Sequence, residues 1–209
     1  LGLAEDFHRA SGRFQALLYK QELEAFFRTP GAAGFQLLGL LDYHGHGFAP
    51  VGVVSALFQP KSYLTPGEFR RFCNEVVILA EMEKRVWTSD EVFNANARLV
   101  DYSQGRKSET GLDWKITTAD QGMLASGKVK SGERIGMELN EISRASRLNL
   151  EISSMDGRYS NDWDFWVYPA HLPSPEDPEI LITRRLDRET LKAIREGKKI
   201  LFVPEQGEV

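Results

Sequence analysis

The sequence predicts an α+β protein made of several segments: a helix–strand–helix part, an antiparallel β-sandwich and a short β-α-β tail. Apolar residues recur at helical spacing over residues 3–28 and alternate with polar residues between about residues 76 and 168. A proline-rich stretch at residues 171–178 then precedes a last α/β pattern. We therefore expect three domains, at residues 1–80, 81–171 and 172–209.

Composition narrows the possible partners. The chain has 209 residues, a charged fraction of 27% and a net charge of −4. Without a cluster of basic residues, this balance gives no reason to expect a nucleic-acid partner. No apolar run approaches the roughly 20 residues that span a bilayer. The sequence also lacks the glycine motifs that bind phosphates and dinucleotides, and we expect no cofactor.

Two features concern the compartment and the extent of the chain. The single cysteine, Cys73, cannot form an internal disulfide, which suits a reducing compartment or a periplasmic domain that needs no disulfide. The sequence starts at Leu1 with neither a methionine nor a signal-like segment. We expect it to be a piece of a longer protein.

Residues 3–28 are predicted to form an amphipathic helix. Charged residues such as Lys20 and Glu24 are expected on the side opposite the apolar ones. The helix should end before Pro30, because proline lacks a backbone donor and disfavours a helical conformation in the residue before it. The apolar residues at helical spacing are Leu3, Phe7, Phe14, Leu17, Leu18, Leu23, Phe26 and Phe27.

The stretch GFQLLGLLDYHGHG, residues 34–47, is expected to hold a buried strand at residues 35–43. A continuous apolar run bounded by turn residues is typical of a strand covered on both faces, as in a parallel sheet. Ligands bind at the carboxyl ends of such strands. The polar residues that end the run are therefore the first candidates for a small-molecule site: Asp42, Tyr43, His44 and His46.

A second helix is predicted at residues 66–74. Thr65 suits the N-cap position, Pro66 the first helical position, and Glu68 can reach back to form a capping box. The apolar residues 51–58 that precede this helix suit either a strand or a helix.

About seven short strands, separated by turn signals every 8 to 12 residues or so, predict an antiparallel sandwich of immunoglobulin-like type. The alternation is clearest at residues 93–99, 148–152 and 163–167. Trp163 and Trp166 are three positions apart, so their indoles should point to opposite faces of the sheet. At most one of them then belongs to the core.

The tail is predicted to form a strand at residues 180–183, a helix at residues 187–196 ended by Gly197, and a strand at residues 200–203. One β-α-β unit cannot bury both faces of its sheet. We expect the tail either to open a further α/β domain or to dock on the sandwich.

Four stretches, in this order, resemble one enzyme family: RTPGAAGFQLLGLLDY, LTPGEFRRFC, NDWDFWVYP and ILITRRLD. They resemble the carboxyl-terminal part of glycoside hydrolase family 2, the β-galactosidase-like enzymes common in gut Bacteroidetes. The resemblance covers nearly the whole chain. It lies in these short stretches and their order rather than in one diagnostic motif. It implies that residues 1 to about 75 are the last helix–strand–helix remnant of a TIM barrel, with residues 35–43 as its eighth strand. Residues 84–170 would be the immunoglobulin-like domain that follows the barrel.

The resemblance also implies an expectation about activity. Family members retain the anomeric configuration with two glutamates at the ends of the fourth and seventh barrel strands, and both would lie upstream of Leu1. Retention needs two carboxyl groups about 5 to 5.5 Å apart on facing strands. This chain is therefore expected to contain no catalytic residue and to be inactive alone. Its parent would be a periplasmic or secreted enzyme that acts on β-linked glycans.

Each candidate residue has two explanations. Asp42 can accept a hydrogen bond from a sugar hydroxyl while Tyr43 stacks on the ring, or Asp42 caps loop amides and Tyr43 belongs to the core. His44 and His46 stand where similar sequences carry proline and glutamine, and they alternate like metal ligands. No third ligand follows at a recognisable spacing, so we predict no metal site and expect a glycine-rich surface loop instead. Trp166 either forms a sugar platform on the sandwich or packs at a domain interface.

Two functions follow as alternatives. The chain is part of a retaining glycoside hydrolase, or it is a non-catalytic β-sandwich module for domain docking or carbohydrate binding. A barrel remnant would expose apolar surface that its neighbours cover in the parent. We therefore expect the isolated chain to self-associate.

Overall fold

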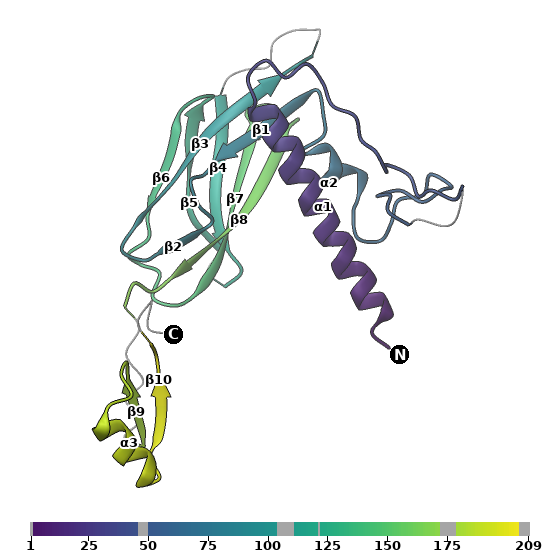
Figure 1. Ribbon diagram of the computed structural model, residues 1–209. Helices are drawn as coiled ribbons and strands as arrows, with labels where there is room; N and C mark the ends of the chain where they lie inside the picture. The colour runs from purple at the N-terminus through teal and green to yellow at the C-terminus, as the bar shows by residue number, and fades with distance from the viewer. Residues whose placement is uncertain (1, 46–49, 104–110, 121, 172–178, 205–209) are drawn as a thin grey trace. The chain divides into compact units, whose positions relative to one another are not determined.

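The computed structural model describes residues 2–45, 50–103, 111–120, 122–171 and 179–204. The chain divides into two compact units, Leu1–Ala170 and His171–Val209, which are treated separately. In the first unit a long helix, an irregular segment and a short helix precede the strands of a two-sheet sandwich (Figure 1). No described helix is long and apolar enough to cross a membrane.

Helix α1 spans Ala4–Arg28, as predicted, and ends just before Pro30. It passes Gly12 without a break, because the ring of Tyr63 packs against the helix there. A Cβ atom at position 12 would lie 2.2 Å from that ring. Gly12 therefore permits a close contact between the helix and the segment at residues 51–64.

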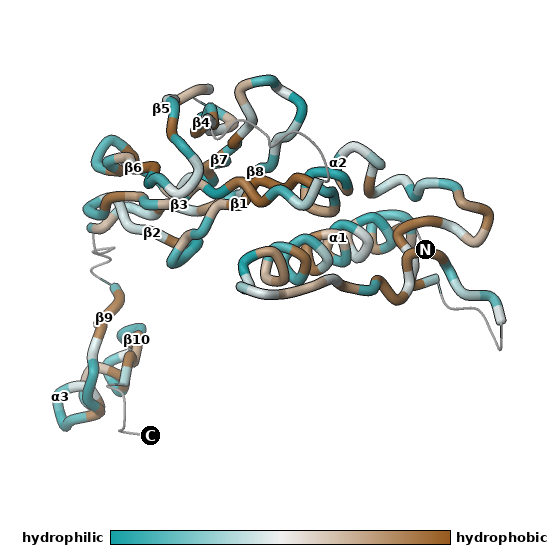
Figure 2. Tube along the Cα trace, turned by 90° about the horizontal axis from the view of Figure 1, so that it is seen from above, coloured by the Kyte–Doolittle hydropathy of each residue, from teal (hydrophilic) through white to brown (hydrophobic). Residues whose placement is uncertain are grey.

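The apolar residues of α1 do not share one side, contrary to the prediction. Leu23 and Phe27 are buried, whereas Phe14 and Leu18 are exposed. Phe14 precedes Leu23, and Leu18 precedes Phe27, by nine residues, which is about two and a half helical turns and places the members of each pair on opposite sides. Helix α1 thus has two apolar faces. One faces the sandwich, and Figure 2 shows the helix between the sandwich and the segment that follows it.

The predicted strand at residues 35–43 is wrong. Leu41 forms one isolated parallel bridge with Val54, and Leu38 is 96% exposed. A strand buried on both faces needs hydrogen-bonding neighbours and covering layers, and no described segment supplies them beside these residues. The described residues between α1 and α2, 29–45 and 50–65, form no helix or strand (Figure 1). The apolar residues 51–58 also form neither a strand nor a helix.

Helix α2, Pro66–Arg70, begins with the predicted capping box. The Thr65 hydroxyl accepts a hydrogen bond from the Glu68 backbone N–H at 3.2 Å, and Glu68 accepts one from the Thr65 backbone N–H at 2.8 Å. The helix ends four residues earlier than expected.

The sandwich contains one three-stranded and one five-stranded sheet among the described residues. The three-stranded sheet has the order β1-β3-β6, with β1 at Val76–Glu81, β3 at Val92–Asp101 and β6 at Arg134–Glu138. The five-stranded sheet has the order β2-β8-β7-β4-β5. Its strands are β2 Val86–Thr88, β4 Gly111–Thr118, β5 Gly122–Lys130, β7 Ser146–Ser154 and β8 Ser160–Tyr168.

The sequence predicted a wholly antiparallel sandwich, but the sandwich observed is mixed. Strand β2 pairs in parallel with β8, and the other pairs of the two sheets are antiparallel. The chain leaves β1 in one sheet and crosses to the edge of the other. There β2 runs in the same direction as β8.

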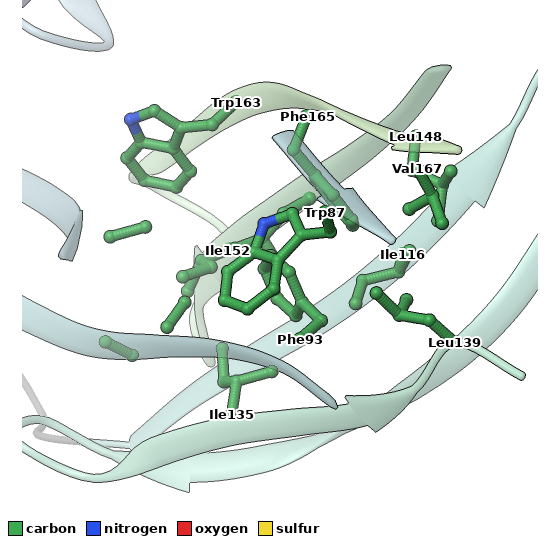
Figure 3. Close-up of a cluster of buried hydrophobic side chains, with 14 of the residues drawn as sticks. Trp87, Phe93, Ile116, Ile135, Leu139, Leu148, Ile152, Trp163, Phe165 and Val167 are labelled. Carbon is green, nitrogen blue, oxygen red and sulfur yellow. The ribbon is translucent and has the colours of Figure 1, made fainter. Parts of the chain in front are cut away.

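The sandwich core is built from alternate residues of both sheets (Figure 3). Phe93 of β3 stacks on Phe165 of β8, with ring centroids 4.2 Å apart, and joins the two sheets. The alternation predicted for the two tryptophans is confirmed: Trp163 is 2% exposed and Trp166 is 39% exposed.

Strand β1 is buried on both faces, which explains how α1 is held. Ile78 and Ala80 belong to the sandwich core. Val77 and Val100 form a second cluster on the other side of the sheet, together with residues of α1 and the α2 region. These members are Leu23 and Phe27 of α1, and Phe72, which follows α2. Burial of these side chains on folding fixes α1 to the sandwich.

The second unit is the predicted β-α-β tail. Strands β9, Ile180–Thr183, and β10, Lys199–Phe202, pair in parallel, and helix α3, Arg188–Arg195, connects them. Asp187 caps α3, since its carboxylate accepts a hydrogen bond from the Thr190 backbone N–H at 2.9 Å. Gly197 follows with a φ of 85°, which ends the helix.

Candidate functional site

A groove of about 540 Å³ lies between α1, the α2 region and β8. We call it the α1–β8 groove. Its size is that of a small-ligand site. The residues that line it are Arg13, Phe14, Ala16, Leu17, Leu18, Lys20, Gln21, Leu64, Glu68, Arg71, Phe72, Arg85, Asp162, Trp163, Asp164 and Trp166.

The β8 wall of the groove is set by strand alternation. Trp163 and Phe165 point into the core, so Asp162, Asp164 and Trp166 point outward. The wall therefore presents two carboxylates followed by an indole.

Both carboxylates are held by polar neighbours. Asp162 accepts a hydrogen bond from Arg71 at 2.7 Å and one from the Asn149 side chain at 3.2 Å. Asp164 accepts a hydrogen bond from the same amide at 2.9 Å. Arg85 donates to the Asp164 backbone carbonyl at 2.9 Å. These contacts place the two acids and two guanidinium groups in fixed positions along the groove.

A buried glutamate lies where α1 meets the sandwich. Glu24 is fully buried, and its carboxylate accepts hydrogen bonds from the Trp163 indole N–H and the Asn161 side-chain amide, each at 3.0 Å. Lys20 lies 3.6 Å from this carboxylate and Arg28 lies 3.7 Å from it. Two cations and two neutral donors thus balance one buried charge, which is the condition for burying it.

Lys20 connects this buried cluster to the groove. Its ammonium donates to the Asn161 side-chain oxygen at 2.6 Å and also to the Asp162 backbone carbonyl. Burial lowers the pKa of Lys20, although the negative charge of Glu24 works in the opposite direction. The ammonium also lies over the Trp163 ring, 5.0 Å from its centroid. The lysine is therefore part of the helix–sandwich junction.

Glu68 forms the opposite wall and joins α2 to α1. Its carboxylate accepts a hydrogen bond from Arg13 at 2.8 Å as well as those of the capping box. The Arg13 guanidinium, followed by the Thr65 backbone amide, lowers the pKa of Glu68 from 4.5 to about 2.

We expect the Glu68 interactions to be lost in acid. Because the pKa of Glu68 is lower in the folded than in the unfolded chain, its contribution to stability is complete above pH 4.5 and disappears as the pH falls toward 2. Glu68→Gln lacks this contribution. Denaturant unfolding measured between about pH 6 and about pH 2 gives the free energy of unfolding of both proteins. This free energy should fall more steeply with decreasing pH for the wild type than for Glu68→Gln. Parallel pH dependences would contradict the assignment.

The described candidates from residues 34–47, Asp42, Tyr43 and His44, do not line the groove. The Asp42 carboxylate is buried and accepts hydrogen bonds from the Lys61 ammonium at 2.7 Å and from the Gly52 backbone N–H at 2.9 Å. Burial alone would raise the pKa of Asp42, but these two hydrogen bonds lower it overall. Tyr43 is 54% exposed rather than in the core. Asp42 thus caps a loop amide, as its second explanation stated.

The two histidines give no metal site among the described residues. His44 is exposed, and no group of three or more potential ligands gathers in the described parts of the chain. His46 lies outside the described residues.

Sequence reasoning missed the polar residues that organise the groove. Lys20, Glu24 and Arg28 follow one another at intervals of four, which places them on one stripe of α1. That stripe lies beside Leu23 and Phe27, which face the sandwich. Charges next to a buried apolar face were the available signal, and they indicate a buried ion cluster rather than a solvated face.

A family model described as a domain of unknown function (DUF8488) matches residues 91–169, which include β3 and β8. No curated protein matches the chain.

Three solved structures show weak similarity of fold. The fibronectin(III)-like modules of Clostridium thermocellum CbhA are 10% identical, with 46% of this chain and 100% of that chain covered and a TM-score of 0.31. An engineered protein is also 10% identical, with 55% and 25% covered and a TM-score of 0.31. Apo β-glucuronidase 3 of Bacteroides uniformis is 13% identical, with a TM-score of 0.29. The match covers 75% of this chain but only 20% of the β-glucuronidase.

Proposed function

We propose that this chain is a non-catalytic part of a retaining, β-galactosidase-like glycoside hydrolase. In this proposal residues 1 to about 75 dock on the catalytic barrel, and the sandwich braces it. The four stretches of sequence resemblance point to this class of enzyme. The structural observation that carries the proposal is the second apolar face of α1.

This outer apolar face lies on the first part of the helix, at residues 3–18. Its side chains are between 47% and 72% exposed, whereas the opposite face packs on the sandwich. A helix that is apolar on two sides is typical of a position between two layers. The members of the outer apolar face are Leu3, Phe7, Phe14, Leu17 and Leu18.

The segment after α1 extends the same exposed surface. The exposed fractions of Leu38, Leu57 and Phe58 are 96%, 79% and 75%. The Tyr19 hydroxyl donates to the Leu38 backbone carbonyl at 3.3 Å, which holds this segment against α1. Large exposed apolar surfaces mark interaction sites. A catalytic barrel domain supplies the apolar partner surface that these side chains require.

The acids of the groove give no reason to expect catalysis by the chain alone. Asp162 is paired with Arg71. Asp162 and Asp164 both accept a hydrogen bond from the Asn149 side-chain amide. Both carboxylates therefore already hold contacts within the protein. The pair of carboxyl groups that retention requires would belong to the barrel.

The first experiment tests activity. The purified chain should not hydrolyse chromogenic β-galactosides or β-glucuronides. Hydrolysis that disappears in Asp162→Asn or Asp42→Asn would place catalysis in this chain and contradict the proposal. The reading frame upstream of the Leu1 codon provides the complementary observation, because the proposal requires a barrel pattern with two glutamates at strand ends.

The second experiment tests docking. We expect the isolated chain to self-associate in sedimentation velocity measurements, because its outer apolar face then finds a second copy. Phe7→Glu with Leu38→Glu should shift the chain to a monomer. Met123→Glu replaces an equally exposed apolar residue of β5 and should leave self-association unchanged. A monomeric wild type at high concentration would count against an exposed docking face.

A further inference from the structure

We propose that the α1–β8 groove of one copy of this chain receives the first turn of helix α1 from a second copy. The two copies then form a two-fold symmetric dimer, in which the two α1 helices lie antiparallel. This inference rests on the docking role proposed for the outer apolar face of α1. It adds the partner that takes this face in the isolated chain, the direction in which the two helices run and the charged residues that fix that direction.

An exposed row of residues runs along α1 with the period of a coiled coil. Its members follow one another at alternating steps of four and three residues. This spacing keeps them on the side of a helix that packs against a second helix. Every member is exposed in the single chain. We call this row the α1 seam, and its members are Leu3, Phe7, Ala10, Phe14, Leu17 and Gln21.

Two copies of the α1 seam are complementary when the helices are antiparallel. A two-fold axis midway along the seam sets Phe7 of each copy opposite Leu17 of the other, and Ala10 opposite Phe14. Each aromatic ring therefore meets a smaller side chain rather than a second ring. Large side chains opposite small ones interdigitate, as close packing between helices requires.

The charges beside the α1 seam favour the antiparallel direction. Asp6, Arg13 and Lys20 follow one another at intervals of seven residues, so they lie on one flank of the seam. In a parallel pair Asp6 would meet Asp6, and Lys20 would meet Lys20. In the antiparallel pair, Asp6 of each copy lies beside Lys20 of the other. Arg13 lies near the axis, where its charge is balanced by Glu68 at 2.8 Å.

The groove also offers a cation that lacks a carboxylate partner. The charged residues that line it are four cations and three acids. Arg85 is half-buried and donates to the Asp164 backbone carbonyl at 2.9 Å, but no described carboxylate forms an ion pair with its guanidinium. Burial lowers the pKa of Arg85. Because a guanidinium keeps its proton in proteins, an incoming carboxylate stabilises it through charge-assisted hydrogen bonds.

Asp6 is suited to supply this carboxylate. It is exposed, and no described residue forms an ion pair with it. All residues from 2 to 11 are exposed, so the first turns of α1 are open to a partner. The seam and the groove are also one continuous surface, because Phe14, Leu17 and Gln21 belong to both. A second α1 that packs on the seam therefore brings its first turn to the end of the groove where Lys20 and Arg85 lie.

Sedimentation equilibrium of the full chain tests the charge contacts. The wild type should form a dimer, because a two-fold interface is closed. Asp6→Lys should raise the dissociation constant of the dimer by about tenfold or more, since symmetry converts two attractive contacts into two repulsive ones. Arg85→Glu should also weaken the dimer, and Asp6→Lys combined with Arg85→Glu should restore at least part of the affinity. Glu22→Lys makes the same charge change on α1 away from the seam and should leave the dimer unchanged.

Cysteine variants test the direction of the helices, in a Cys73→Ala background. Phe7→Cys together with Leu17→Cys should give a disulfide-linked dimer on oxidation, because the antiparallel register sets these two positions opposite each other. Leu3→Cys alone would link a parallel pair, and it should remain unlinked.

Four results would overturn the inference. They are an assembly larger than a dimer, a dimer unchanged in both charge variants, a double charge variant as weak as the single ones, and a linked Leu3→Cys dimer. In each of these cases the docking role of the outer apolar face would still stand if Phe7→Glu with Leu38→Glu prevented association. A monomeric wild type would contradict both the docking face and the dimer. Failure of the inference and failure of the proposed function are therefore distinguishable.

Discussion

Replacing Glu24 by alanine should lower the free energy of unfolding by about 3–5 kcal/mol. The change removes the acceptor of the Trp163 indole N–H and of the Asn161 amide, and both donors lie in the buried junction. It also leaves Lys20 next to the core without its counter-charge. Breaking a buried ion pair from one side costs more than the pair itself contributes, because the remaining charge stays desolvated.

Urea unfolding followed by tryptophan fluorescence would measure this loss. Glu24→Gln keeps an acceptor oxygen but no charge, and we expect a smaller loss of about 1–3 kcal/mol. Glu22→Ala removes an exposed acid of the same helix and should change stability by less than about 0.5 kcal/mol. Adding Lys20→Met to Glu24→Gln should restore part of the stability. A loss below about 1 kcal/mol in Glu24→Ala would show that the junction is hydrated.

The outcome for α1 shows what helical periodicity can predict. Spacing of apolar residues identified the helix and its end before Pro30. The spacing did not show that the apolar residues lie on two opposite faces. Both sets recur at helical intervals, and the sequence does not say which partner each set packs against. Glu24 was placed on the solvent side for the same reason. Its burial depends on Trp163 and Asn161, which are about 140 residues away in sequence and cannot be paired with it by local pattern.

The strand expected at residues 35–43 failed for a related reason. An apolar run indicates a preference for burial. A strand also needs neighbouring strands that form hydrogen bonds with its backbone N–H and C=O groups. The nearest partner in the described chain is Val54, through one isolated bridge to Leu41. The segment keeps its apolar residues and leaves several of them exposed.

The sandwich was more predictable because its strands alternate in sequence. Alternation alone predicted that Trp163 and Trp166 point to opposite faces, and the structure places Trp163 in the core and Trp166 outside it. Strand β2 was missed, since three residues are too few to show a period of two. Its parallel pairing with β8 joins segments that are far apart in sequence, so no local pattern can predict it.

Phe165→Ala should be as damaging as the loss of Glu24, at about 3–5 kcal/mol. Phe165 and Phe93 are both fully buried, and they stack between β8 of one sheet and β3 of the other. Truncation removes the contact that joins the sheets and leaves a cavity that two paired sheets cannot close. Dense packing makes such a cavity costly.

The neighbouring Trp87 provides a matched comparison within the same core. Its ring contacts Phe93 edge to face, with centroids 5.5 Å apart, but its indole N–H is buried without a partner among the described residues. Trp87→Phe therefore removes volume and an unsatisfied donor together, and it should cost much less than Phe165→Ala. Urea unfolding of both variants measures the difference. If Trp87→Phe were as destabilising as Phe165→Ala, the indole N–H would have a partner, and ring volume alone would not govern stability at this position.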